Sequence, residues 1–169
     1  MQSFASTYMQ TLSQIYDTER QIAVSLPASP AVRSDTSFAA SLIDLQRQSN
    51  RQVSRLEGIF RVLYREPRGE ASWVATALLR QAFVSAEEGC AAGCAAALLA
   101  LTRYELTLYE SLLRWSEQCD LTEALPVLRR CLAEEFLQAS NLAECAFGSS
   151  VWERRRSLTS TARAPATLQ

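Results

Sequence analysis

The sequence predicts an all-α protein, built as a bundle of four long helices with a shorter helix between the two helical pairs. Apolar residues recur at spacings of three and four over long segments, which is the period of an amphipathic helix. The chain is 48% apolar, with only five Gly and five Pro in 169 residues. No segment shows the alternation of polar and apolar residues that is typical of a strand.

The length of the chain is typical of one domain. We expect a single bundle domain over residues 1–150 and a basic, flexible tail over residues 151–169. The tail is expected because three consecutive Arg follow Glu153 and no sustained apolar period comes after them.

The first two helices are bounded by breaking and capping residues. The first is expected over about 3–26, and it ends before Pro27 because proline cannot continue a helix. Ser, Asp or Thr at 34–36 can accept hydrogen bonds from the free amides that begin the second helix. That helix is expected to end near Tyr64, ahead of the Glu-Pro-Arg-Gly segment at 66–69.

Three further helices follow. The short one, over about 71–87, is expected to bury its larger side chains, Trp73, Val74, Leu78 and Phe83. After Gly89 a long helix is expected over about 91–119. Asp120, with Glu123 three residues later, predicts a capping box for the last helix, which is expected to end near Gly148.

Polar residues interrupt the apolar stripes of the four long helices. The spacing places Glu19, Glu105 and Glu135 inward, with Gln48 and Thr102 near them. Buried carboxylates are costly unless they are paired, hydrogen-bonded or bound to a metal. Inward carboxylates from separate helices are also how ferritin-like di-metal bundles are built.

Four segments carry a resemblance to a known family, in the right order and spacing. They are Ile15–Gln21 followed by Ser25–Pro27, Gln52–Phe60, Tyr104–Tyr109 followed by Leu121–Ala124, and Leu132–Glu135. From about Tyr8 to Cys145 the chain is similar to the bacterial YciF/YciE-like ferritin-like proteins. The resemblance implies a ferritin-like four-helix bundle with an extra middle helix, a stress response, dimerisation and a di-metal carboxylate site.

The resemblance also implies which parts of that metal site remain. Four carboxylates are kept, Glu19, Glu105, Glu134 and Glu135. Other family ligands fall on residues that do not match, namely Leu45, Gln48, Thr102, Arg103 and Ala139. We therefore expect a vestigial metal site, with Gln48, Thr102 and Arg103 as buried polar residues.

Three interpretations of the polar residues stay open. The chain has no His, which excludes His-based triads, HExxH zinc sites and the Glu-x-x-His iron motif. The first interpretation is a metal-free core in which Arg51 or Arg103 pairs with the carboxylates. The second is a weak site for one divalent metal, and the third is a set of solvated acids at the boundary of the core.

The net charge of −1 argues against broad binding to nucleic acid or membranes. No apolar run is long enough to span a membrane and no secretory signal is visible, so a cytoplasmic location is expected. The first functional hypothesis is a non-enzymatic, cofactor-free, stress-associated protein that binds itself as a homodimer or a cognate protein, in an adaptor or immunity role. Its candidate surface anchors are Tyr64, Trp115 and Trp152.

Two other functions are compatible with the sequence. One is a metal-binding oxidative-stress protein that keeps a reduced carboxylate site. The other is thiol-based redox sensing through Cys90 and Cys94, which the Ala-rich surroundings of these residues disfavour. Most of the five cysteines are expected to be small residues buried in the core.

Overall fold

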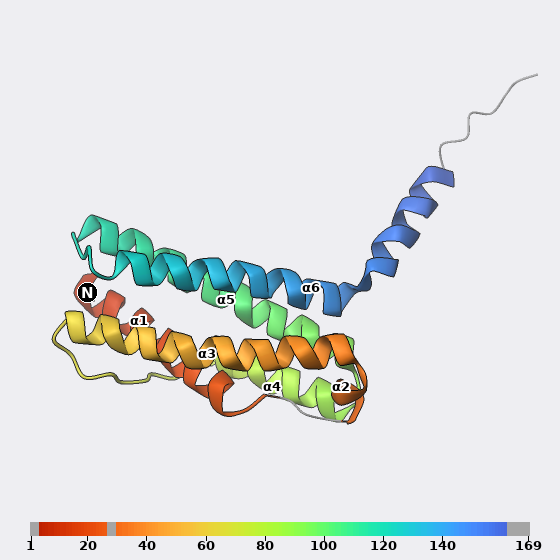
Figure 1. Cartoon of the computed structure of the whole chain (residues 1–169), viewed down its shortest axis with the longest axis horizontal. Helices are drawn as coiled ribbons and strands as arrows, with labels where there is room; N and C mark the ends of the chain where they lie inside the picture. The colour runs from red at the N-terminus through yellow and green to blue at the C-terminus, as the bar shows by residue number, and fades with distance from the viewer. Residues whose placement is uncertain (1–3, 27–29, 162–169) are drawn as a thin grey trace, which may run out of the picture.

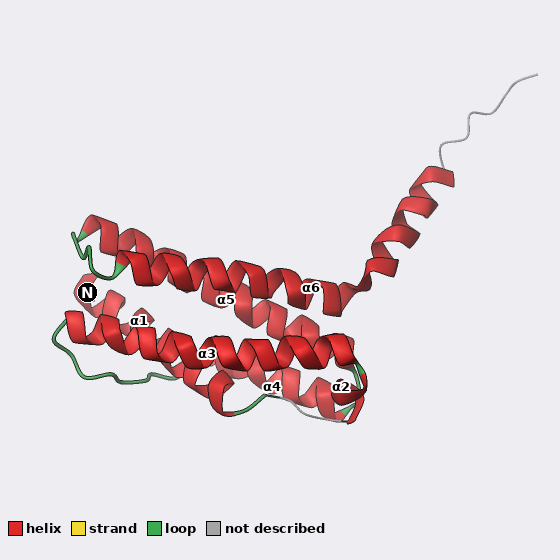
Figure 2. Ribbon diagram, viewed as in Figure 1, coloured by secondary structure: helices red, strands yellow, loops and turns green. Residues whose placement is uncertain are grey.

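The computed structural model describes residues 4–26 and 30–161, and every regular element found in them is a helix (Figures 1 and 2). In chain order the elements are α1 Phe4–Val24, α2 Pro30–Ser34, α3 Thr36–Val62, α4 Trp73–Glu87, α5 Ala91–Gln118 and α6 Leu125–Thr161. The predicted all-α fold class is therefore confirmed. Within the described ranges, no helix combines the length and the apolar character needed to cross a membrane.

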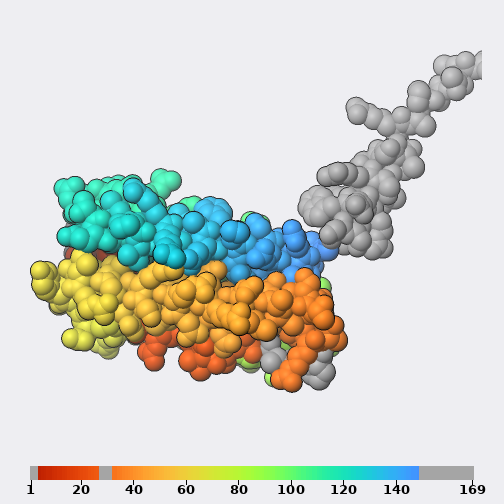
Figure 3. All heavy atoms as spheres, in the orientation of Figure 1, coloured from red at the N-terminus to blue at the C-terminus, as the bar shows by residue number. Residues whose placement is uncertain are grey.

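The four long helices α1, α3, α5 and α6 form the bundle. Helix α1 packs against α3, α3 against α6, α6 against α5 and α5 against α1, which closes a ring of four. Figure 3 shows α3 and α6 side by side along one face of this ring. Helix α4 packs on α5, and it is the extra helix that the sequence predicts between the two pairs. The short helix α2, which packs on α3, was not predicted.

Residues with a left-handed backbone end three of the helices. Tyr64, Gly89 and Asp120 have φ angles of 53°, 77° and 55°. The amide after each of them donates to the carbonyl five positions earlier, at 2.8–2.9 Å, which is the Schellman arrangement at a helix C-terminus. The predicted capping box of Asp120 and Glu123 is therefore wrong. Asp120 belongs to the end of α5, and α6 begins only at Leu125.

Helix α4 exposes Trp73 and Val74, which contradicts the prediction for these two residues, whereas Leu78 and Phe83 are half-buried. The side chains of Trp73 and Val74 are 92% and 47% exposed. The residues that α4 buries are mostly small, namely Ala75, Leu79, Ala82, Ser85 and Ala86. Small side chains let α4 approach the Ala-rich first turns of α5 closely, so contact with α5 decides the orientation rather than side-chain size.

Gly148 interrupts α6 with φ 59° and ψ 148°, where the sequence predicts the end of the helix. The backbone is helical again up to Thr161, and Figure 1 shows this continuation pointing away from the bundle. Part of the predicted tail 151–169 is therefore helical, and residues 162–169 lie outside the described residues.

Candidate functional site

A layer of buried polar side chains crosses the bundle and separates two apolar clusters. One cluster contains Ile15 and Phe60, and the other contains Ile22 and Leu45. Between them the four long helices contribute Glu19 from α1, Gln48, Ser49 and Gln52 from α3, Thr102 and Glu105 from α5, and Glu135 from α6. We call these seven residues the polar layer.

Five residues of the polar layer are ones that the helical period predicts to face inward. Glu19, Glu105, Glu135 and Thr102 are each 1% exposed, and Gln48 is 7% exposed. A carboxyl on a helix with such a stripe has no route to solvent, because apolar residues flank it one turn above and below. The four helices therefore bring three carboxyl groups into the interior.

Hydrogen bonds join the polar layer across helices. The Tyr109 hydroxyl, from the neighbouring apolar cluster, lies 2.9 Å from Glu19 Oε1 and 3.3 Å from Gln52 Oε1, and it donates to both oxygens. Gln48 Nε2 donates to Glu135 Oε1 at 2.7 Å. Two carboxyl groups are thus held by donors from neighbouring helices of the bundle.

Burial shifts the pKa values of all three carboxyl groups upward. The pKa values of Glu19 and Glu105 lie well above their ordinary value, because burial disfavours the charged form and the neighbouring carboxyls repel one another. Burial also raises the pKa of Glu135, to about 7, although the amides of Gln52 and Gln48 oppose the shift. Burial therefore favours the neutral form of all three carboxyl groups.

Three atoms of the polar layer have no hydrogen-bond partner. They are Gln52 Nε2, Glu105 Oε1 and Glu135 Oε2. An unsatisfied buried polar group costs about 1–3 kcal/mol. The Gln52 amide is near enough to Glu135 to lower its pKa without making a well-formed hydrogen bond. The polar layer therefore carries a cost in stability that apolar residues would avoid.

No Arg described in the structure is buried beside these carboxyls. Arg51 and Arg103 are exposed, so the expectation of a buried Arg103 is wrong, and neither residue forms the predicted pair with the polar layer. The position of Arg103 on α5 is one residue after the inward-facing Thr102, which turns its side chain away from the core.

The Arg that does pair with a family carboxylate is Arg55. Its guanidinium binds Glu134 with two hydrogen bonds of 2.7 and 3.0 Å at the edge of the bundle, and Arg130 adds a third contact at 3.3 Å. Burial alone raises the pKa of Glu134, but these partners outweigh it and leave the pKa below its ordinary value. Glu134 is thus an ionised carboxylate outside the polar layer, and Arg55 and Arg130 balance its charge.

The residues do not fit the two-metal centre of ferritin-like bundles. That centre uses about four carboxylates and two His. This chain has no His, and Arg55 engages Glu134. Over residues 4–26 and 30–161, no three His, Cys, Asp or Glu side chains gather closely enough to hold a metal ion. The arrangement holds three buried carboxyl groups whose pKa values are raised.

The cysteines divide between core and surface. Cys94 and Cys131 are buried, and burial raises their pKa values to about 11 and about 12. Cys90 and Cys119 are exposed and Cys145 is half-buried, so the prediction that most cysteines are core residues is wrong. Cys90 caps α5, where its Sγ accepts a hydrogen bond from the Gly93 amide at 3.2 Å. Cys90 and Cys119 lie at the two ends of α5, and the helical period does not predict whether a residue at the end of a helix is exposed.

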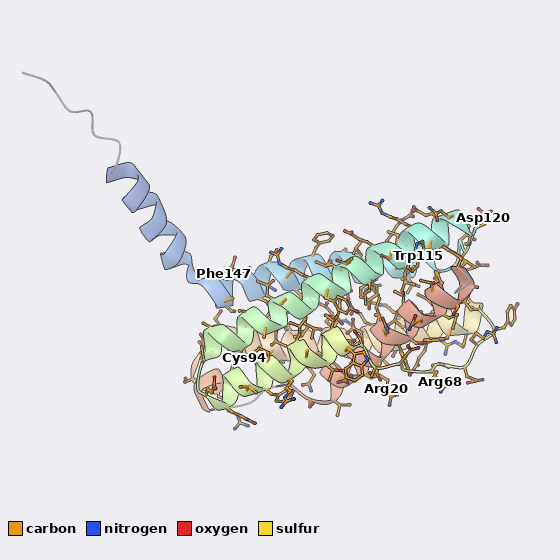
Figure 4. All side chains as sticks on the ribbon, turned by 180° about the vertical axis from the view of Figure 1, so that it is seen from behind. Arg20, Arg68, Cys94, Trp115, Asp120 and Phe147 are labelled. Atoms are coloured by element: carbon orange, nitrogen blue, oxygen red, sulfur yellow. The ribbon has the colours of Figure 1, made fainter. Side chains whose placement is uncertain are left out.

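The aromatic anchors proposed from the sequence differ in exposure. Trp115 is half-buried near the end of α5 (Figure 4), and its ring packs on Phe4 and Tyr8 with centroid distances of 5.8 and 6.4 Å. Tyr64 is 95% exposed. The side chain of Trp152 lies outside the described part of the structure. Sequence reasoning missed Trp73 as an exposed aromatic, because it assigned that residue to the core.

Gln52, Tyr109 and Arg55 were also missed. Gln52 and Tyr109 stand on the same inward stripes as Gln48 and Glu105, and that position was the signal that could have added them to the site.

The bundle, its extra helix and the carboxyls on its inward faces define a ferritin-like helical protein. The model of the family described as "Domain of unknown function (DUF892)" matches residues 3–151, and the chain belongs to this family. The resemblance inferred from the residues is thereby confirmed.

Two solved structures share the fold. The E. coli stress protein YciF superposes with a TM-score of 0.73 at 21% identity, over 87% of this chain and 96% of that chain. YcfI from Rhodopseudomonas palustris superposes with a TM-score of 0.72 at 22% identity, over 83% of this chain and 93% of that chain. The comparison with curated proteins found no match.

Proposed function

We propose that this protein is a non-enzymatic, stress-associated cytoplasmic protein that binds another protein, either a second copy of itself or a cognate partner, on a ferritin-like scaffold with a degenerate metal site. The observation that carries the proposal is the donor set of the polar layer. Its carboxyls receive hydrogen bonds from Tyr109 and Gln48, and Glu134 is matched by Arg55. The association with stress rests on the likeness to YciF, a stress protein.

The outer face of α4 is the interaction surface that the proposal assigns. It carries Trp73, Val74 and Val84, which are 92%, 47% and 37% exposed. Arg80 lies among them and lines a shallow cavity of about 300 Å³ with Trp73 and Val84. Exposed Trp and Arg side chains are over-represented among the residues that dominate binding energy at protein interfaces. We call this surface the α4 face.

The test compares two exposed aromatics. Sedimentation velocity over a range of protein concentrations, and capture of partners from the native cell extract, are run on the wild type, Trp73→Ser and Tyr64→Ser. We expect Trp73→Ser to weaken a stoichiometric homodimer or complex by at least tenfold, and Tyr64→Ser to leave it unchanged. A protein that is monomeric at every concentration and captures no stoichiometric partner would contradict the proposal, as would a complex that is indifferent to Trp73→Ser.

One observation favours a second candidate, a metal-binding protein with a reduced carboxylate site. Glu105 Oε1 and Glu135 Oε2 are buried acceptors without donors, and a hard divalent cation prefers such oxygens. Metal content is measured by inductively coupled plasma mass spectrometry after incubation with Fe²⁺, Mn²⁺ or Zn²⁺. One tightly held ion per chain that Glu105→Gln releases would support this candidate. Metal well below one ion per chain would support the first proposal.

A further inference from the structure

A second cavity lies away from the polar layer, where α1 ends and α2 leads into α3. Its volume is about 470 Å³, which is within the range of roughly 300–1,000 Å³ that small-molecule sites occupy. The lining residues are Val24, Ser25, Leu26, Val32, Arg33, Ala39, Leu42, Ile43 and Gln46. We call it the α1–α3 cavity.

The walls of the α1–α3 cavity are mainly apolar. Of the apolar lining residues, Val32 and Leu42 are buried, while Val24 and Ile43 are 82% and 51% exposed. Gln46 is the one amide side chain among the described lining residues, and it donates one N–H to the Ala23 carbonyl at 3.0 Å. A ligand in the cavity therefore covers two large aliphatic side chains that are exposed in the free protein.

Among the described residues that line this cavity, Arg33 alone carries a charge. Arg33 makes no ion pair or hydrogen bond with any described residue. The acids nearest to it in the chain are engaged elsewhere. Asp35 caps α3 by accepting from the Phe38 amide at 3.0 Å, and Asp44 pairs with Arg47 at 3.8 Å. A mainly apolar cavity whose lining includes one Arg that pairs with no described residue matches a ligand with a hydrocarbon chain and one anionic group.

We propose that the α1–α3 cavity binds a free single-chain amphipathic carboxylate of the fatty-acid class. The hydrocarbon chain lies against Leu42, Ile43 and Val24, and the carboxylate pairs with the Arg33 guanidinium. This assignment is independent of the α4 face, because no residue of α4 lines the cavity. A planar guanidinium suits a carboxylate because two of its N–H groups can donate to the two oxygens in parallel.

The test uses dodecanoate as the probe, below its micelle concentration, with the full chain. Isothermal titration calorimetry is run on the wild type, Arg33→Gln and Ala39→Phe, with circular dichroism to show that each variant is folded. Ala39 is a half-buried residue of the cavity wall, so a phenyl ring there fills the space from one side. We expect saturable binding of one dodecanoate per chain, weakened about fivefold by Arg33→Gln, as for a solvent-exposed ion pair, and abolished by Ala39→Phe.

The control variant is Arg65→Gln. Arg65 lines a smaller apolar cavity of about 280 Å³ at the other end of the bundle, with Phe4 and Leu121. Dodecanoate binding is expected to be unchanged in this variant, and dodecyltrimethylammonium, with the same chain and the opposite charge, is expected to bind more weakly than dodecanoate.

Four results would overturn the proposal. They are no saturable binding of dodecanoate, equal affinity for the cationic analogue, a loss of affinity that follows Arg65 in place of Arg33, and binding to phosphatidylglycerol vesicles without binding of free dodecanoate. The last result would assign Arg33 to a membrane surface.

Discussion

Raising the pH from 5 to 8 is expected to destabilise the folded protein, because the carboxyls of the polar layer must ionise inside the core. The pKa of Glu135 is about 7 in the folded protein against an ordinary value of 4.5. Between these values the folded state binds more protons than the unfolded state, so the unfolding free energy falls as the pH rises. The contribution of Glu135 is fully present below pH 4.5 and is lost once the pH has passed about 7.

The magnitude follows from the shift. Each pKa unit corresponds to about 1.4 kcal/mol, so the shift of Glu135 corresponds to a loss of roughly 3 kcal/mol across this window. Glu19 and Glu105, whose pKa values also lie well above the ordinary value, act in the same direction. Because typical domains are stable by only about 5–15 kcal/mol, a change of this size is readily measured.

The assay is urea unfolding followed by circular dichroism at pH 5, 6, 7 and 8, in the presence of a chelator. The chain contains no His, so the side chain that usually dominates titration in this range does not contribute. The Glu135→Gln variant is expected to show a shallower slope between pH 5 and 7 than the wild type. An unfolding free energy that is constant or rises from pH 5 to 8, or an equal slope in Glu135→Gln, would refute the reasoning.

Three further predictions concern single substitutions, each measured as the unfolding free energy in urea. Tyr64→Gly is expected to stabilise by about 1 kcal/mol, because it relieves the left-handed backbone at φ 53°; Tyr64→Ala is the control and should give no such gain. Tyr109→Phe is expected to destabilise by about 1–2 kcal/mol, because Glu19 and Gln52 lose their shared donor, and an unchanged value would show that this hydroxyl contributes nothing. Glu105→Met is expected to stabilise by about 1–3 kcal/mol at pH 8, because Oε1 has no partner; a loss of stability there would mean that a bound group satisfies Glu105.

The long helices and the inward positions of the polar layer could be predicted from the sequence because both follow from the 3.6-residue period alone. Glu19 and Glu105 each replace one apolar residue in an otherwise regular stripe, so their burial requires no knowledge of neighbouring helices. The ends of the helices were predicted less well. Asp120 is a favourable residue both for starting a helix and for ending one in a left-handed conformation, and the sequence does not say which role prevails.

Features that depend on which helices touch were not predictable. Helix α4 has an aromatic and aliphatic face as well as an Ala-rich face, and only its contact with α5 decides that Trp73 is exposed. In the same way Arg55 and Glu134 come from separate helices, and their pairing at 2.7 Å depends on how α3 and α6 align. The periodicity of a helix does not reveal which residue of another helix its side chains will contact.

Hydrogen bonds between helices also bear on how the two halves of the bundle align. Tyr109–Glu19, Gln48–Glu135 and Arg55–Glu134 each join a residue that precedes the long connection of residues 63–72 to one that follows it. Leu and Ile surfaces alone would tolerate a slide of one helical hairpin along the other by a turn, since apolar contacts are not directional. Such a slide would separate the buried carboxyl groups from their hydrogen-bond donors. These polar residues thus favour one axial alignment of the two hairpins, at the cost of some stability.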